Sequence, residues 1–166
     1  MSQHSTGGRG GNGGSTGEAF VTSYRANLPA GFRARRHHIA FYELLSSVEL
    51  VLAKAQSPSG WKQLLELIEV LDVACREHMD AEEESGMFTK LRDALPAGQE
   101  RVIAQLEQGH TTLRSELSAI RDAIRTEPDV SCADPILSAR LGAWLTDMYA
   151  HEDQELDLLK EAYAVD

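Results

Sequence analysis

Four long amphipathic segments of this chain each carry a histidine on the apolar face that a helix would bury. This feature restricts the fold more than any other. Apolar residues recur at alternating three- and four-residue steps over 33–55, 58–85, 98–126 and 135–163. This spacing predicts one apolar face on each of four helices. Strand signals are absent. We therefore expect an all-α protein whose helices form an up-down-up-down four-helix bundle.

Proline and glycine mark the ends of these helices. Ser57 precedes Pro58, and Asp134 precedes Pro135, so an oxygen suited to capping stands before a proline suited to the first helical position. Gly86 predicts that the second helix stops or bends, and one or two further turns are expected after it. These signals leave only short connections between the helices.

The amino-terminal part of the chain has a different composition. Seven glycines fall between residues 7 and 17, together with serine, threonine, asparagine and arginine. Such a segment cannot bury enough apolar surface to offset the entropy of ordering it. We expect residues 1–32 to be a flexible tail with a short lead-in segment, and residues 33–163 to form one helical domain.

Charge and hydropathy exclude several classes of partner. Sixteen Lys and Arg against twenty-six Asp and Glu give a net charge of −10, which repels nucleic-acid phosphates and anionic lipid. No apolar run is long enough for a membrane span, and the amino terminus lacks the apolar run of a secretory signal. The two cysteines show no C-x-x-C spacing, which fits a reducing compartment. We expect a cytoplasmic protein with no nucleic-acid or membrane partner.

The apolar stripes contain polar residues that a helix core does not normally accept. On the second helix the stripe continues through His78 to Glu82, and on the fourth through His151 to Glu155. Residues four apart project from one face of a helix. An ionised carboxylate in a bundle core costs several kcal/mol unless its charge is compensated. Two such carboxylates together therefore predict a bound cation.

All four helices bring a histidine to the same half of an up-down-up-down bundle, because successive helices run in opposite directions. Neutral imidazoles combined with carboxylates suit iron or manganese and, less distinctively, zinc. The simplest construction holds two metal ions, one between the histidines of the first two helices and one between those of the last two, with both glutamates bridging. The candidate ligands are His38, His78, Glu82, His110, His151 and Glu155.

The order His, HxxxE, His, HxxxE over four helices resembles the hemerythrin-like, or HHE cation-binding, family. Residues 77–84, followed by Met87 and Phe88, are similar to the signature of that family's second helix, and residues 150–155 to that of its fourth. The resemblance covers about residues 33–163. It implies a left-handed four-helix bundle with a non-haem centre of two iron ions, oxo- or hydroxo-bridged, held by the six candidate ligands. Manganese or zinc in place of iron is the alternative.

The chain departs from the oxygen-carrying members of that family. Those members have a second histidine on the third helix, four residues from the first, and an aspartate five residues after the histidine of the fourth. Here Leu106 and Arg114 flank His110 at that spacing, and Leu156 stands five residues after His151. The missing imidazole argues against respiratory oxygen carriage. The pattern resembles the bacterial hemerythrin-like branch, which is associated with peroxide, nitric oxide or iron handling.

Neighbouring residues leave two choices open. His37 follows the apolar rhythm of the first helix as well as His38 does, and the spacing in the family favours His38. The acidic residues beside the candidate ligands are interpreted as a solvated face, from which a spare ligand could come: Glu83, Glu84, Glu152 and Asp153.

These observations predict a non-haem di-iron protein that binds oxygen, peroxide or nitric oxide inside a four-helix bundle. One alternative is an iron- or oxygen-responsive regulatory or sensor module whose fold is stabilised by metal. A further alternative is an enzyme with peroxidase- or catalase-like activity, or one that reduces nitric oxide. The expected partner is a diatomic or peroxide ligand. The sequence indicates no catalytic residue, organic cofactor, electron donor, protein partner or oligomeric state.

Overall fold

The computed structural model describes residues 30–55, 57–126 and 134–163. Residues 1–29, which make up most of the predicted tail, lie outside the described residues, so the domain boundary at residue 32 stays a prediction. Within the described ranges the chain is helical and contains no strand. The all-α class is therefore confirmed.

Five α-helices and one 3-10 turn account for nearly all of this part of the chain. Their bounds are α2, Ala30–Leu52; α3, Pro58–Glu84; α4, Met87–Ala94; η1, Ala97–Gln99; α5, Glu100–Thr126; and α6, Pro135–Tyr163. The long helices follow the apolar rhythm of the sequence closely. The largest difference is in α2, which covers 30–52 where 33–55 was expected.

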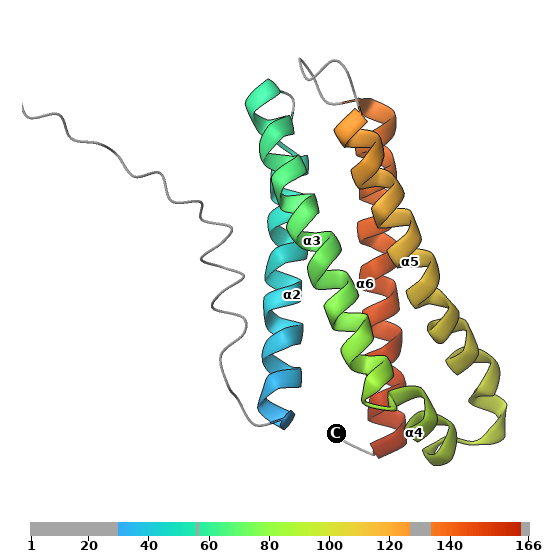
Figure 1. The fold of residues 1–166 in the computed structure, drawn as a ribbon. Coiled ribbons are helices and arrows are strands. Elements are labelled where there is room, and N and C mark those ends of the chain that lie inside the picture. Colours follow the sequence, from blue (N-terminus) through green and yellow to red (C-terminus); the bar gives the residue numbers. More distant parts are fainter. Residues whose placement is uncertain (1–29, 56, 127–133, 164–166) are drawn as a thin grey trace, which may run out of the picture.

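The four long helices pack side by side as a bundle. α2 packs against α3 and α6, and α5 packs against the same two helices. Figure 1 shows the start of α2, the end of α3, the start of α5 and the end of α6 at one end of the molecule, where α4 also lies. The handedness and the full up-down-up-down topology stay predictions from the sequence.

The ends of the helices have the expected local causes. The Ser57 hydroxyl accepts a hydrogen bond from the backbone N–H of Gly60 at 3.2 Å and so caps α3. The Asp134 carboxylate accepts one from the N–H of Ile136 at 2.7 Å at the start of α6. Gly86 adopts a φ of 71°, in the left-handed region that favours glycine. This conformation lets α3 end and α4 begin at once.

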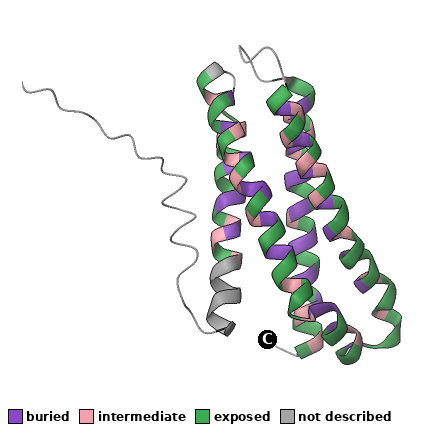
Figure 2. Ribbon diagram, in the orientation of Figure 1, coloured by how far each residue is buried: buried purple, intermediate pink, exposed green. Residues whose placement is uncertain are grey.

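Apolar side chains form two clusters along the bundle axis. The larger one includes Trp61 and Trp144, and the smaller one lies beneath α4 and includes Phe88. Along α5, His110 lies between Leu106, which belongs to the smaller cluster, and Leu113, which belongs to the larger one. Figure 2 shows that the buried residues lie on the faces that the helices turn toward one another. His110 is therefore enclosed by apolar layers on both sides, whereas the His38 side chain on α2 is 40% exposed.

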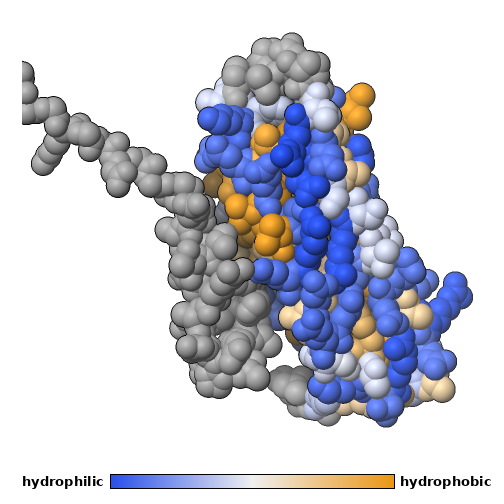
Figure 3. Space-filling model, viewed as in Figure 1, coloured by the Kyte–Doolittle hydropathy of each residue, from blue (hydrophilic) through white to orange (hydrophobic). Residues whose placement is uncertain are grey.

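Polar side chains cover most of one face of the molecule. The face seen in Figure 3 is mostly hydrophilic, with small separate apolar areas, as the net charge of −10 leads one to expect. No described helix is long and apolar enough to cross a membrane.

Candidate metal centre

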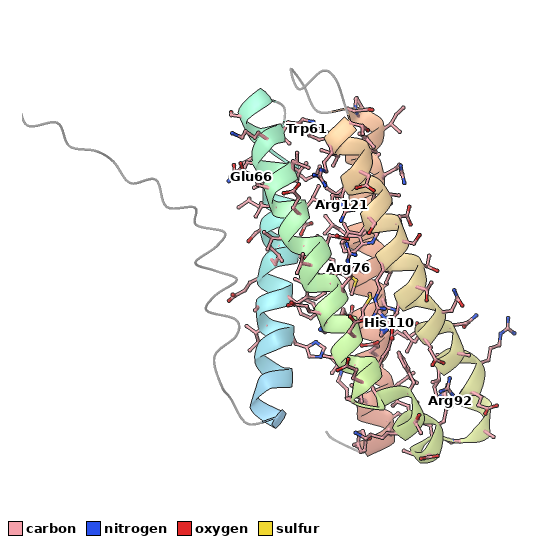
Figure 4. All side chains as sticks on the ribbon, viewed as in Figure 1. Trp61, Glu66, Arg76, Arg92, His110 and Arg121 are labelled. Carbon is pink, nitrogen blue, oxygen red and sulfur yellow. The ribbon has the colours of Figure 1, made fainter. Side chains whose placement is uncertain are left out.

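One histidine from each long helix projects into the same region of the bundle. Figure 4 labels His110, on α5, in the half of the bundle that contains α4. His78 lies on α3, His151 on α6 and His38 on α2. The structure brings all six residues predicted from the sequence into two neighbouring groups that could each hold a metal ion. The His37 side chain lies outside the described part of the structure, so the choice of His38 rests on where the structure places it.

The first group joins α2 and α3. It consists of His38, His78 and Glu82, whose candidate ligand atoms all lie within 4.8 Å of one another. The Nε2 atom of His78 lies 3.1 Å from Oε1 of Glu82, and the Nε2 atom of His38 lies 3.6 Å from the same oxygen. One carboxylate oxygen therefore faces two imidazole nitrogens from different helices.

The second group joins α5 and α6. It consists of His110, His151 and Glu155, again with ligand atoms within 4.8 Å. Oε1 of Glu155 lies 3.1 Å from Nε2 of His110 and 3.2 Å from Nε2 of His151. This arrangement repeats that of the first group, so the centre is built from two similar halves.

Glu82 extends from one group to the other. Its Oε1 atom faces His38 and His78, while its Oε2 atom lies 3.6 Å from Nε2 of His110. The described contacts of Glu155 with histidines are to the second group alone. The geometry thus suits Glu82 as a bridge between two ions, whereas the bridging role expected for Glu155 has no such contact in its support.

Glu152 is a functional candidate that lies inside the bundle, so its predicted place on the solvated face is wrong. Its side chain is only 1% exposed, so it does not belong to a solvated acidic face. Its Oε1 lies 2.9 Å from Nε2 of His78, and its Oε2 lies 3.2 Å from Nδ1 of His38. A second apolar rhythm on α6, through Leu141, Leu145, Met148, Glu152 and Glu155, could have revealed this position. Glu84 and Asp153 are exposed as expected.

Glu83 is a second acidic residue that contacts the centre. It is 40% exposed, but its Oε1 lies 2.9 Å from Nδ1 of the fully buried His110. Glu83 is thus exposed, as expected, and also contacts a buried histidine of the centre. The spacing of Glu83 and His110 in the sequence gives no signal of this contact, because it depends on how α3 packs against α5.

The three glutamates of the centre lie close together, and their burial and mutual repulsion oppose the ionisation of all three. Glu82, Glu152 and Glu155 have oxygens within 4.8 Å of one another. Burial, followed by repulsion from Glu155 and Glu152, raises the pKa of Glu82 to about 10. Burial opposes ionisation of Glu152 too, but hydrogen bonds with His38 and His78 outweigh it and lower its pKa to about 2. The negative charge of the neighbouring carboxylates therefore disfavours the ionised form of Glu82, and the protein's own groups do not offset this effect.

Unpaired polar atoms fit a metal at this place. Both carboxylate oxygens of Glu82, Oε2 of Glu155 and Nε2 of His151 are buried with no hydrogen-bond partner among the described residues. A buried carboxylate elsewhere in the bundle differs sharply. Asp72 is paired with Arg76 and Arg121 and accepts a hydrogen bond from Ser118 at 3.0 Å. Since the protein neutralises Asp72 but not Glu82, the nitrogen and oxygen donors of the centre suit an added cation.

Gly109 allows the second group to form. A Cβ atom at this position would lie 2.9 Å from Nδ1 and 3.0 Å from Cε1 of His151. Real Cβ atoms essentially never approach so closely. The missing side chain therefore lets the imidazole of α6 lie against the backbone of α5, next to His110.

Comparison with known proteins agrees with this geometry. The family model described as "Hemerythrin HHE cation binding domain" matches residues 33–156. These residues include all six predicted ligands as well as Glu83 and Glu152. No curated protein and no solved structure matches the chain significantly.

Proposed function

Because the chain belongs to the hemerythrin HHE cation-binding family, we propose that it is a non-haem protein that holds two iron ions inside its bundle. The bundle that we propose around these ions is left-handed and up-down-up-down. One observation carries the proposal: each half of the centre supplies two histidines and one buried carboxylate. Two histidines with one carboxylate, leaving further positions open, is a ligand set of non-haem iron sites.

The seven side chains divide between the ions as their contacts indicate. His38, His78 and Glu152 would hold the first ion, and His110, His151 and Glu155 the second, with Glu82 between them. The cations would offset the repulsion among the three carboxylates. The apolar clusters on either side would keep the imidazoles of the three buried histidines, His78, His110 and His151, in place.

The open positions are the basis for proposing a small ligand. When bound, iron supplies the electron exchange and the vacant coordination positions that oxygen, peroxide or nitric oxide require. The protein's own groups provide a mostly buried, preorganised set of donors around those positions. We therefore propose a diatomic molecule or peroxide as the partner.

Metal content tests this proposal directly. Protein made in iron-replete cells should contain close to two irons per chain, and its absorption spectrum should change on addition of azide. Glu82→Ala should lose most of the iron, while Glu84→Ala, which removes an exposed charge from the same turn, should keep it. A folded wild-type chain that binds no metal would contradict the proposal. Manganese or zinc at the same stoichiometry would retain the two-ion site and overturn the assignment of iron.

A sensor role is the second candidate, and the unneutralised Glu82 favours it. A centre whose carboxylates repel one another without a cation couples metal binding to folding. If the chain is a sensor, chelation should reduce the helical circular dichroism signal as well as remove the metal. A chelated chain with an unchanged helical signal favours a ligand-binding protein instead. Sustained peroxide turnover, as opposed to stoichiometric binding, would indicate an enzyme.

A further inference from the structure

The imidazole of His110 is held from both sides. On the inner side, its Nε2 lies 3.1 Å from Oε1 of Glu155. On the outer side, its Nδ1 lies 2.9 Å from Oε1 of Glu83. His110 itself is completely buried, whereas Glu83 reaches the surface. The ring therefore connects the centre of the bundle with a carboxylate outside it.

Glu83 is fixed in turn by a cation from α5. Nη2 of Arg114 lies 3.0 Å from the same Oε1 atom of Glu83 and 2.9 Å from Oδ1 of Asp80. Arg114 stands one helical turn after His110, so both groups approach Glu83 from the same helix. The guanidinium limits where the carboxylate can lie and keeps it close to Nδ1.

The other histidines of the centre have different surroundings. His38 and His78 contact Glu82 and Glu152, both of which belong to the centre. Nδ1 of His151 faces the backbone of Gly109. Among the described residues, His110 is thus the histidine whose second nitrogen contacts a carboxylate outside the centre.

A neutral imidazole has one nitrogen that carries hydrogen and one with a free lone pair. A carboxylate at Nδ1 accepts the hydrogen there and leaves the Nε2 lone pair free to bind a metal. Carboxylates in this position orient the ring and raise its basicity toward the metal.

From this geometry we propose that Glu83 is a positioning residue for the second metal ion, and that Arg114 holds Glu83 in place. The proposal rests on the proposed function, since it concerns the same two-ion centre. It assigns an asymmetry to the centre: the ion held by α5 and α6 has a ligand supported from outside, while the ion held by α2 and α3 does not.

Two substitutions at Glu83 separate its hydrogen bond from its charge. Glu83→Gln keeps an oxygen that can accept from Nδ1 and loses the charge, whereas Glu83→Ala loses both. The controls are Glu84→Gln and Glu84→Ala, which make the same changes at an exposed neighbour on α3. Circular dichroism of the metal-free chains checks that each variant folds.

The measurement is the affinity of the full chain for Fe²⁺ under anaerobic conditions, by competition with a chelator. We expect the ion held by α5 and α6 to bind about 10- to 100-fold less tightly in Glu83→Ala than in Glu84→Ala. Glu83→Gln should fall between them, and Arg114→Gln should weaken binding less than Glu83→Ala. In the zinc-loaded chain, the Nδ1–H signal of His110 should persist in Glu83→Gln and be lost by exchange in Glu83→Ala.

The outcomes are distinguishable. If the wild-type chain binds iron and Glu83→Ala matches Glu84→Ala in affinity, the role of Glu83 is refuted and the two-ion centre stands. If the folded wild-type chain binds no metal at all, the proposed function fails and the role of Glu83 fails with it.

Discussion

At the scale of single residues, the identity of the buried carboxylates decides what the centre can hold. Histidines were found from the sequence because they interrupt apolar stripes, and Glu82 and Glu155 because they continue those stripes at a spacing of four. The sequence assigns Glu152 to the solvated face because it directly follows His151, and neighbouring residues on a helix usually face different ways. Only the contacts of Glu152 with His38 and His78 show that both residues point inward.

Replacing Glu152 tests whether it belongs to the centre. Glu152→Ala should lower iron content below that of the wild-type chain, because it removes the carboxylate nearest to His38 and His78. Asp153→Ala is the matched control, since Asp153 is the exposed next residue on the same helix. Metal analysis of both purified proteins measures the effect. Equal iron content in the two variants would show that the metal does not use Glu152.

At the scale of helices, the sequence could predict the elements but not all of their contacts. Proline, glycine and capping residues fix where α3, α4 and α6 begin, and these are local effects. Local sequence signals do not decide between His37 and His38, because these two adjacent residues fit the apolar rhythm of the helix nearly equally well. The contact of Glu83 with His110 was beyond prediction for the same reason, since it depends on the relative placement of α3 and α5.

The close approach of α5 and α6 at Gly109 leads to a prediction about helix spacing. Gly109→Ala should weaken iron binding, because the new Cβ would collide with the His151 ring. Gly142→Ala is the control: it lies within α6, where a Cβ would meet nothing within 4 Å, and alanine should stabilise the helix by up to about 1 kcal/mol. Chelator competition and thermal unfolding measure the two effects. Unchanged affinity in Gly109→Ala would show that α5 and α6 can separate without cost to the centre.

The ion pairs of Asp72 connect α3 and α5 away from the centre. Asp72→Ala should lower the free energy of unfolding by about 1–3 kcal/mol, because hydrogen bonds to a buried charged group are lost. Both arginine partners reach solvent, so water can hydrate their charges after the substitution. The loss of stability is therefore smaller than for a substitution that leaves a buried charge without a partner. Denaturant unfolding should show a similar loss with and without metal, since Asp72 does not contact the candidate ligands. A change in iron content would contradict this separation.

At the scale of the whole molecule, the metal-free protein should respond to pH through Glu82. Burial and neighbouring carboxylates raise the pKa of this residue from 4.5 to about 10, so the folded chain retains a proton that the unfolded chain releases. The contribution of Glu82 to stability is therefore present at low pH and is lost as pH rises through the range between these two values.

Glu82→Gln removes this titration and provides the comparison. Between pH 5 and 9 the free energy of unfolding of the metal-free wild-type chain should fall more steeply with pH than that of Glu82→Gln. Urea unfolding at several pH values measures both slopes. Parallel slopes would mean that Glu82 is not held in its protonated form in the metal-free bundle.

The position of the centre along the bundle has a consequence for how the molecule loses its metal. The larger apolar cluster, with both tryptophans, lies on the side away from α4 and contains no candidate ligand. We expect chelation to loosen the α4 end first and leave the opposite end intact. Tryptophan fluorescence would then stay constant while amide hydrogens of α4 exchange faster. Bound iron would thus stabilise only one end of the bundle, the end that contains α4.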